Sequence, residues 1–188
     1  SVDNSLDNEH KCQIMATVGG IYDNKTNVEI SIRVDNSLCN GYTFGSDGGD
    51  IEALPATHYT LSSDKIVIEK GKVLGGVTVN FTDAFFKDPK STSLNYVIPV
   101  VMTGVQNADT ILEGKPSVET PNRINKDDWE VQPKDYVLYA VKYISKYDSH
   151  YLRRGIDVYS GNKTGKEVRH ADYVEKDETI GGFSTIGL

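Results

Sequence analysis

The residues best suited to chemistry gather in one short segment, YDSHYLRRG, at positions 147–155. It contains two tyrosines, an aspartate, a histidine and two arginines, and it closes on a glycine. Aromatic faces attract polarised C–H groups and charged side chains anchor hydroxyls, so these residue types suit a sugar-binding site. They equally suit an ordinary β-hairpin with a polar, solvated face. The choice depends on how the local backbone directs each side chain.

Strand geometry separates the two arginines of this segment. Successive side chains of a strand point to opposite faces, so Arg153 and Arg154 cannot both hold one ligand unless the strand is bulged. One of them is expected to pair with Asp148 or Asp157 through a charge-assisted contact. This geometry favours a structural role for the segment, with ligand contact through Tyr147 or Arg154 as the alternative.

Other aromatic side chains extend the candidate sugar platform. The glycan-binding interpretation rests on Trp129, Tyr143, Tyr147, Tyr151 and Arg154. The opposing interpretation is that the tyrosines pack in a core and send their hydroxyls to its rim, as buried tyrosines do. Trp129, which follows two aspartates, also fits a wedge between two domains.

No pattern of catalytic residues accompanies these candidates. The four histidines stand in no catalytic signature, and the G-x-S-x-G, H-E-x-x-H and Gly-rich phosphate-loop patterns are missing. The turn SDGGD at 46–50 offers Asp47 and Asp50 to a calcium ion, but a solvated turn explains it as well. We therefore predict no catalytic residue, no metal site and no cofactor.

Composition restricts the class of partner. The 188 residues carry 20 Lys+Arg against 27 Asp+Glu, a net charge of −7, and an evenly mixed acidic surface argues against nucleic acid. The chain lacks an apolar run long enough to form a transmembrane helix. Cys12 and Cys39 are too few for a metal cluster or a disulfide scaffold. They fit either a single bridge or a reduced pair.

The dominant sequence period is two, which predicts strands instead of helices. Strands are predicted at residues 27–35, 65–69, 76–81 and 95–105. The first alternates cleanly, with one apolar face formed by Val28, Ile30, Ile32 and Val34. Pro99 removes one ladder donor from the last, which predicts a bulge or a sheet edge there. Short strands at this spacing predict an all-β fold, with an Ig-like β-sandwich over residues 1–114.

The composition and the periodicity of the sequence change near residue 113. Residues 113–129 hold two prolines and little periodicity, so they are interpreted as a linker or long crossover. A strand follows at 135–147, with 151–161 predicted as its return strand and 166–176 as a third. Residues 115–188 are therefore expected to form a linker and the start of a second β segment, complete or incomplete.

Three stretches together resemble a known family. Residues 54–79 have Leu-Pro, then Tyr-Thr-Leu, then a strand, a glycine turn and a strand, and residues 94–115 resemble a closing strand with its loop. Residues 136–159 resemble the opening of a second domain. The resemblance is to a Bacteroidetes family of unknown function, surface lipoproteins of glycan-utilisation loci. Its N-terminal Ig-like domain also precedes the catalytic domain of some family-18 endo-glycosidases.

The resemblance implies a function without a catalytic set. The D-x-x-D-x-D-x-E signature of family-18 glycosidases is absent, and no lipidated cysteine signal is visible. The family implies a non-catalytic module at the cell surface, as an outer membrane lipoprotein whose lipid anchor is lost from this chain, or in the periplasm. The module would bind glycan or space a partner domain. The alternatives are a cell-surface adhesin or structural protein, and a glycoside hydrolase fragment.

Overall fold

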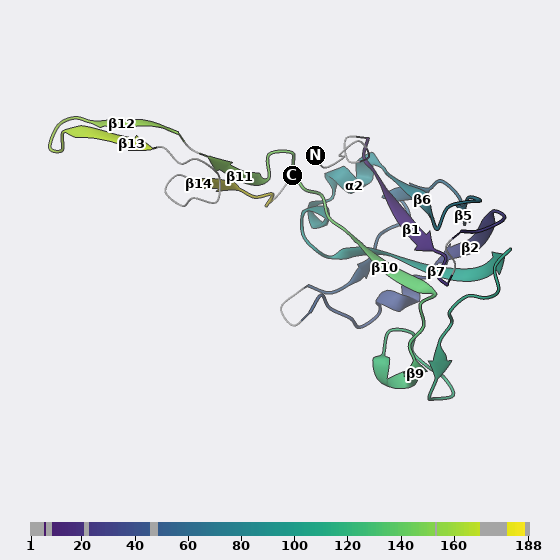
Figure 1. Cartoon of the computed structure of the whole chain (residues 1–188). Coiled ribbons are helices and arrows are strands. Elements are labelled where there is room, and N and C mark those ends of the chain that lie inside the picture. The colour runs from purple at the N-terminus through teal and green to yellow at the C-terminus, as the bar shows by residue number, and fades with distance from the viewer. Residues whose placement is uncertain are drawn as a thin grey trace. The chain divides into compact units, whose positions relative to one another are not determined.

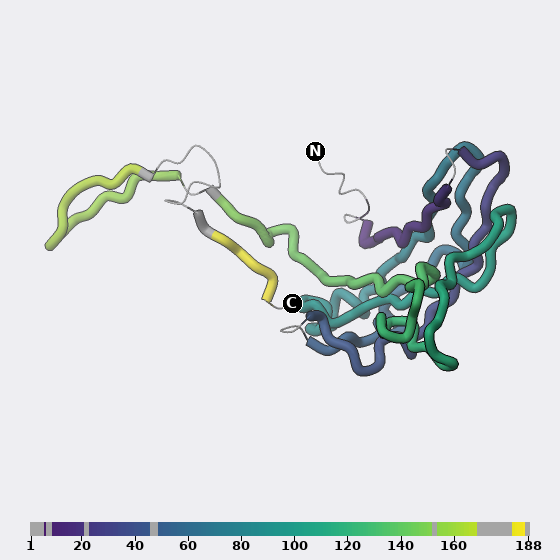
Figure 2. The backbone as a smooth tube through the Cα atoms, turned by 60° about the horizontal axis from the view of Figure 1, so that its bottom comes forward, coloured from purple at the N-terminus to yellow at the C-terminus, as the bar shows by residue number. Residues whose placement is uncertain are grey.

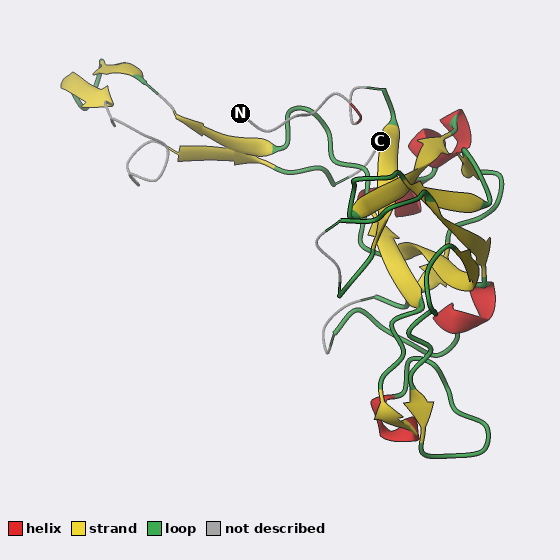
Figure 3. Cartoon of the chain, turned by 45° about the vertical axis from the view of Figure 1, so that its right-hand side comes forward, coloured by secondary structure: helices red, strands yellow, loops and turns green. Residues whose placement is uncertain are grey.

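The computed structural model describes residues 6, 9–20, 23–45, 49–152, 154–169 and 180–186. The chain divides into two compact units, Ser1–Lys142 (unit 1) and Tyr143–Leu188 (unit 2). Figures 1 and 2 colour the chain from purple at the N-terminus to yellow at the C-terminus. Strands dominate both units, as the yellow elements of Figure 3 show. The prediction of an all-β, sandwich-like fold is confirmed.

Unit 1 is built on a curled sheet with the strand order β1–β6–β5–β2–β7–β10, in which β3 also pairs with β7 and β4 with β6. The strands of unit 1 are β1 (Lys11–Thr17), β2 (Val28–Val34), β3 (Glu52–Ala53), β4 (Tyr59–Leu61), β5 (Lys65–Ile68), β6 (Leu74–Phe81), β7 (Tyr96–Gln106), β8 (Lys115–Pro116), β9 (Trp129–Val131) and β10 (Tyr136–Val141). The short helical turns are η1 (Asn36–Cys39), α2 (Asp83–Lys87), η2 (Pro89–Thr92) and η3 (Lys126–Asp128).

The predicted alternation of β2 supplies the centre of the core. Val28, Ile30 and Ile32 are buried, whereas Val34, at the end of the strand, is half-buried. Inward-facing aliphatic residues of β1, β5 and β6 complete this core: Ile14, Ala16, Ile66, Ile68, Val77 and Val79. Removal of these side chains from water is the main favourable contribution to the folding of unit 1.

Pro99, in β7, stands opposite Asp35, the residue that directly follows β2. β7 lies between β2 and β10, and a proline in such a central strand leaves a neighbouring carbonyl without its ladder donor. The Asp35 N–H donates to the Pro99 carbonyl at 2.9 Å, while the Asp35 carbonyl accepts from the Leu38 N–H at 3.2 Å. The chain thus leaves the sheet after Val34 and enters η1. The irregularity in the β2–β7 register lies elsewhere, between Ser31 and Ile32.

Residues 113–129, predicted as a linker or crossover, form an ordered excursion of unit 1. β8 pairs with β9, and the Trp129 indole N–H donates to the Asn122 carbonyl at 2.8 Å. Arg123 reaches the carboxylate of Asp135, with an Nη2–Oδ2 distance of 2.7 Å and a second contact through Nε. Asp135 is only 1% exposed, so this pair holds the excursion to the sheet.

β10 then extends the sheet of unit 1. It pairs antiparallel with β7, from Tyr136 opposite Val101 to Val141 opposite Tyr96. Because of this ladder, unit 1 continues through Lys142, whereas the sequence placed the domain boundary after residue 114. The change in composition and periodicity near residue 113 marks the start of an excursion, after which the chain returns to the same sheet.

Unit 2 consists of two separate two-stranded ladders. β11 (Ser149–Leu152) pairs with β14 (Ile180–Phe183), and β12 (Gly155–Tyr159) pairs with β13 (Gly165–Arg169). The predicted pairing of 135–147 with 151–161 is wrong, because β10 pairs with β7 and β12 with β13. None of the side chains described in unit 2 is buried.

A hydrogen-bonded carboxylate joins the β3–β4 connection to β7. Asp88 Oδ2 accepts from the Tyr96 hydroxyl at 2.6 Å and lies 3.0 Å from His58 Nε2, and Asp88 Oδ1 accepts from the Lys90 N–H at 2.9 Å. The Tyr96 hydroxyl, followed by the Lys90 N–H and His58, lowers the pKa of Asp88. Burial and the Asp88 carboxylate together raise the pKa of Tyr96 to about 12.

Both cysteines are free thiols. Cys39, in η1, is 4% exposed, and burial is the main cause that raises the pKa of its thiol. Cys12, in β1, is half-buried. Across the residues described, no helix has the length and apolar character needed to cross a membrane.

The Arg123–Asp135 pair predicts a large effect of one substitution. Arg123→Ala leaves a buried carboxylate without its cation, so the free energy of unfolding should fall by about 3 kcal/mol in urea titrations. The control is Arg33→Ala, which breaks the exposed 2.9 Å pair with Asp35 and should cost about 1 kcal/mol or less. Equal losses in the two variants would contradict a special role for the buried pair.

The Tyr96–Asp88 hydrogen bond predicts a pH-dependent loss of stability. Because the folded pKa of Asp88 is lowered, its contribution is present above the unfolded value of about 3.9 and is lost as the pH falls through the folded pKa. Tyr96→Phe should therefore reduce the free energy of unfolding by about 1.5 kcal/mol at neutral pH, and by clearly less in acid. Urea titrations at both pH values measure this, and a loss that does not change with pH would argue against the carboxylate as the partner.

Candidate functional site

The β11–β14 ladder carries an aromatic pair on one face. Tyr151 stands opposite Gly181, and Phe183 stands opposite Ser149. Side chains alternate between the two faces of a strand, so these four positions share one face and the two rings occupy its diagonal. The ring centroids lie 5.4 Å apart with an interplanar angle of 81°, which is an edge-to-face arrangement. We call Tyr151 and Phe183 the ring pair.

Both rings are open to solvent. Phe183 is 65% exposed and Tyr151 is 39% exposed. A two-stranded ladder has no second layer of its own to cover such side chains. The ring pair therefore presents apolar faces to water, which is the requirement for stacking on the C–H face of a sugar ring.

Tyr147 lies beside the ring pair. Its carbonyl accepts from the Tyr151 hydroxyl at 2.9 Å, and its own ring is 64% exposed. The Lys146 ammonium lies 5.1 Å from the centroid of the Tyr147 ring, a cation–π contact. Lys146 thus lies over one face of this ring, whereas the hydroxyl bond fixes the Tyr151 side chain in place.

A small hydrogen-bond network joins the turn before β11 to the residues after β14. The Thr185 N–H donates to Asp148 Oδ2 at 2.7 Å, and the Ser145 N–H donates to Thr185 Oγ1 at 2.9 Å. The Asp148 N–H closes the turn on the Ser145 carbonyl at 2.8 Å. Asp148, considered from the sequence as a partner for an arginine, here anchors the end of the ladder that carries the ring pair.

The structure brings together some of the sequence-derived candidates. Tyr147 and Tyr151 are joined by the hydroxyl bond, and Tyr143 is a half-buried residue of the same unit. Arg154 is exposed between β11 and β12 and has an interaction partner. Trp129 belongs to unit 1 and donates its indole N–H to Asn122.

Phe183 is the residue of the site that sequence reasoning missed. It stands in the Gly-rich stretch TIGGFSTIGL, where the absence of alternation obscures a strand. The sequence signal that could have revealed it is a single aromatic residue flanked by small residues, which allow a second strand to pair closely. Arg153 and Asp47, which the sequence offered for charge pairing and for calcium, lie outside the described residues.

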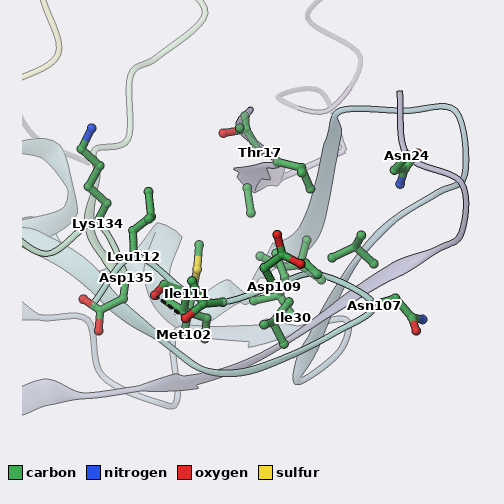
Figure 4. Close-up of a pocket in the computed structure, with 18 of the residues that line it drawn as sticks. Thr17, Asn24, Ile30, Met102, Asn107, Asp109, Ile111, Leu112, Lys134 and Asp135 are labelled. Carbon is green, nitrogen blue, oxygen red and sulfur yellow. Dashed lines mark hydrogen bonds between the residues drawn. The ribbon is translucent and has the colours of Figure 1, made fainter. Parts of the chain in front are cut away.

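Unit 1 contains a half-open cavity of about 1040 Å³ (Figure 4). Apolar side chains of five strands line it, among them Ile14, Ile30, Ile66, Met102 and Val137. Polar residues such as Asn107, Asp109 and Lys134 also line it, and Tyr136 is its aromatic residue. Because aliphatic side chains dominate the described lining and sugar stacking uses flat aromatic faces, the cavity is a weaker glycan candidate than the ring pair.

Thr57, His58 and Asp88 form a hydroxyl–imidazole–carboxylate chain in unit 1. Thr57 Oγ1 lies 3.0 Å from His58 Nδ1, and His58 Nε2 lies 3.0 Å from Asp88 Oδ2. The same Asp88 oxygen accepts from Tyr96, and neither Thr57 nor His58 lines the cavity. The contacts join a turn to β7.

The described part of the chain contains no cluster of three His, Cys, Asp or Glu side chains that could hold a metal ion. Asp50, a candidate calcium ligand from the sequence, forms an isolated bridge with Thr43. The carboxylates of unit 2 described here instead have hydrogen-bond roles, such as Glu167 accepting from the Tyr159 hydroxyl at 2.7 Å.

Comparisons with known proteins cover unit 1 and extend beyond it. A family model described as a "-like, N-terminal domain" matches residues 1–109. A crystal structure of a protein of unknown function from Bacteroides ovatus has a TM-score of 0.83 and 48% sequence identity, over 99% of this chain and 59% of that chain. The chain therefore spans less than two thirds of that protein. The predicted resemblance to a Bacteroidetes family of unknown function is confirmed.

Two other solved structures are much less similar. A Bacteroides ovatus protein provisionally described as carbohydrate binding has a TM-score of 0.42 and 16% identity, over 80% of this chain and 38% of that chain. An auxiliary nutrient binding protein from Bacteroides thetaiotaomicron has a TM-score of 0.41 and 13% identity, over 90% and 57%. These TM-scores are too low to indicate a shared fold. None of the curated proteins matches the chain.

The indole bond of Trp129 predicts a stability effect confined to unit 1. Trp129→Phe removes the donor to the Asn122 carbonyl, so the free energy of unfolding of unit 1 should fall by about 1 kcal/mol. Circular dichroism during urea unfolding measures the change. Tyr159→Phe, which removes the surface bond to Glu167 in unit 2, serves as the control. A Trp129→Phe variant as stable as the parent would show that the indole bond contributes nothing to unit 1.

Proposed function

We propose a glycan-binding function for this chain, which belongs to the family of the "-like" N-terminal domain matched at residues 1–109. In this proposal the protein is a non-catalytic module of a glycan-utilisation system, located at the cell surface or in the periplasm. Unit 1 is the scaffold domain, and unit 2 carries the contact surface. The site comprises Tyr151 and Phe183, with Tyr147 beside them.

The exposure of the ring pair is the observation that carries this proposal. The two aromatic side chains are in contact and are 39% and 65% exposed. Their apolar surface is removed from water only when a partner covers them, and this removal is favourable. A sugar ring is such a partner, because its axial C–H groups stack on an aromatic face while its hydroxyls stay solvated. Tyr147 and the Lys146 ammonium add a further ring and a donor beside the pair.

Affinity gel electrophoresis tests the proposal directly. The full chain should be retarded in gels that contain a soluble polysaccharide from a panel of host and plant glycans. Tyr151→Ala and Phe183→Ala should each weaken this retention about tenfold or more, because each removes a central aromatic contact. Trp129→Ala and Tyr147→Ala, measured in parallel, determine whether those two side chains also contribute.

The control variant is Tyr159→Ala. Tyr159 is also a tyrosine of unit 2, but the Lys163 ammonium lies 4.2 Å from its ring centroid and its hydroxyl is bonded to Glu167. Retention should be the same for this variant and the parent chain. Absence of retention on every glycan of the panel would remove the binding function and favour the spacer alternative. Release of reducing ends over time would favour a glycoside hydrolase.

The spacer or adhesin alternative has an observation of its own. Ile156 stands opposite Val168 in the β12–β13 ladder, and Val158 shares their face because side chains alternate. These three residues are 60%, 68% and 68% exposed, so they form an open apolar patch on a face that also carries Lys166, opposite Val158. Such a face suits contact with another protein surface. Ile156→Ser should then reduce protein–protein association without changing glycan retention.

A further inference from the structure

The angle between the two exposed rings restricts the shape of the glycan. The Tyr151 and Phe183 rings make an interplanar angle of 81° at a centroid separation of 5.4 Å. We propose that the ring pair selects a bent, single glycan chain in solution over the flat face of an insoluble, ordered polysaccharide. This inference rests on the proposed glycan-binding function and names the class of glycan that the same site accepts.

Stacking geometry provides the first step. An aromatic face attracts the C–H groups of a sugar ring that lies parallel to it. Two rings almost perpendicular to each other can therefore stack on two sugar rings only if those rings are also steeply inclined. In a flat, ordered polysaccharide such as cellulose the sugar rings are coplanar, so one of the two aromatic rings would meet the surface edge-on. A bent chain, for example one with α-linkages, presents inclined rings.

The size of the supporting ladder provides the second step. Neighbouring strands of a ladder lie about 4.8 Å apart, and β11 and β14 are two strands of four residues each. The two remaining positions on the face of the ring pair are Ser149 and Gly181, a small hydroxyl side chain and a residue with no side chain. This face fits the width of one glycan chain, and it lacks the row of coplanar rings that a crystalline surface would contact.

The hydroxyl of Tyr151 provides the third step. It donates to the Tyr147 carbonyl at 2.9 Å, so the ring is held in its inclined orientation before any ligand binds. Its oxygen still has lone pairs that can accept from a sugar hydroxyl. A site organised in advance loses less conformational entropy on binding, which favours the ligand shape that matches the inclined rings over a shape that requires them to rotate.

The test compares three kinds of glycan with the full chain. Soluble glucans with bent backbones, amylose and dextran, and a soluble straight glucan, hydroxyethyl cellulose, are used in affinity gels. Microcrystalline cellulose and chitin are used in sedimentation assays. We expect retention by at least one bent glucan, at least tenfold weaker binding to the straight one, and no sedimentation with either solid. Phe183→Ala should weaken the retention about tenfold or more, and Tyr159→Ala should leave it unchanged.

The Tyr151→Phe variant separates ring orientation from ring presence. It keeps the aromatic face but loses the bond to the Tyr147 carbonyl, so the preference for bent over straight glucan should fall severalfold while some retention remains. Sedimentation with a solid that depends on Phe183, or stronger retention by the straight glucan, would overturn this inference and leave the glycan-binding function intact. Retention by none of these glycans would overturn the inference, and absence of retention on the full host and plant panel as well would remove the proposed function with it.

Discussion

The exposed aromatic side chains of unit 2, the basis of the proposed contact surface, depend on one constraint, the number of strands in its ladders. A two-stranded ladder has two faces and can bury neither unless another element covers it. In unit 1, β7 is flanked by β2 and β10, and its first six residues are buried, Tyr96 among them. In unit 2 the corresponding aromatic residues, Tyr151 and Phe183, stay exposed. The same residue types are therefore buried in one unit and exposed in the other.

Unit 1 depends in turn on how the chain returns to its sheet after residue 113. The excursion from β8 to β9 contributes no buried aliphatic residue of its own to the core. Its position is set by polar contacts, above all the pair of Arg123 with the buried Asp135. Asp135 directly precedes β10, and its carbonyl accepts from the Met102 N–H at 2.7 Å. The ion pair and the start of the β7–β10 ladder thus share one residue.

The sequence allowed prediction of those features that follow from alternation. The strands at 27–35, 65–69, 76–81 and 95–105 are all present; alternation was sufficient signal for the first, and a continuous apolar run for the last, whose first six residues are buried. The effect of Pro99 was predicted only in part: the missing donor is real, but its consequence falls on the neighbouring strand at Asp35. A proline reveals which hydrogen bond is missing and not which partner adjusts.

What could not be predicted depends on pairing between distant segments. β10 has apolar residues on both faces, so its sequence pattern fits pairing with either β7 or β12. Only the structure shows that its partner is β7. Phe183 lies more than 30 residues from Tyr151, in a stretch without alternation, so nothing local connects the two rings. The glycan-binding roles of Trp129, Tyr143, Tyr147, Tyr151 and Arg154 stay predictions.

The buried thiol of Cys39 has a kinetic consequence. The side chain is 4% exposed, and its raised pKa keeps it in the unreactive thiol form. A thiol reagent can therefore modify it at an appreciable rate only while η1 and the adjoining end of β2 are open. The rate at which Cys39 is modified therefore reports how often this part of unit 1 opens locally.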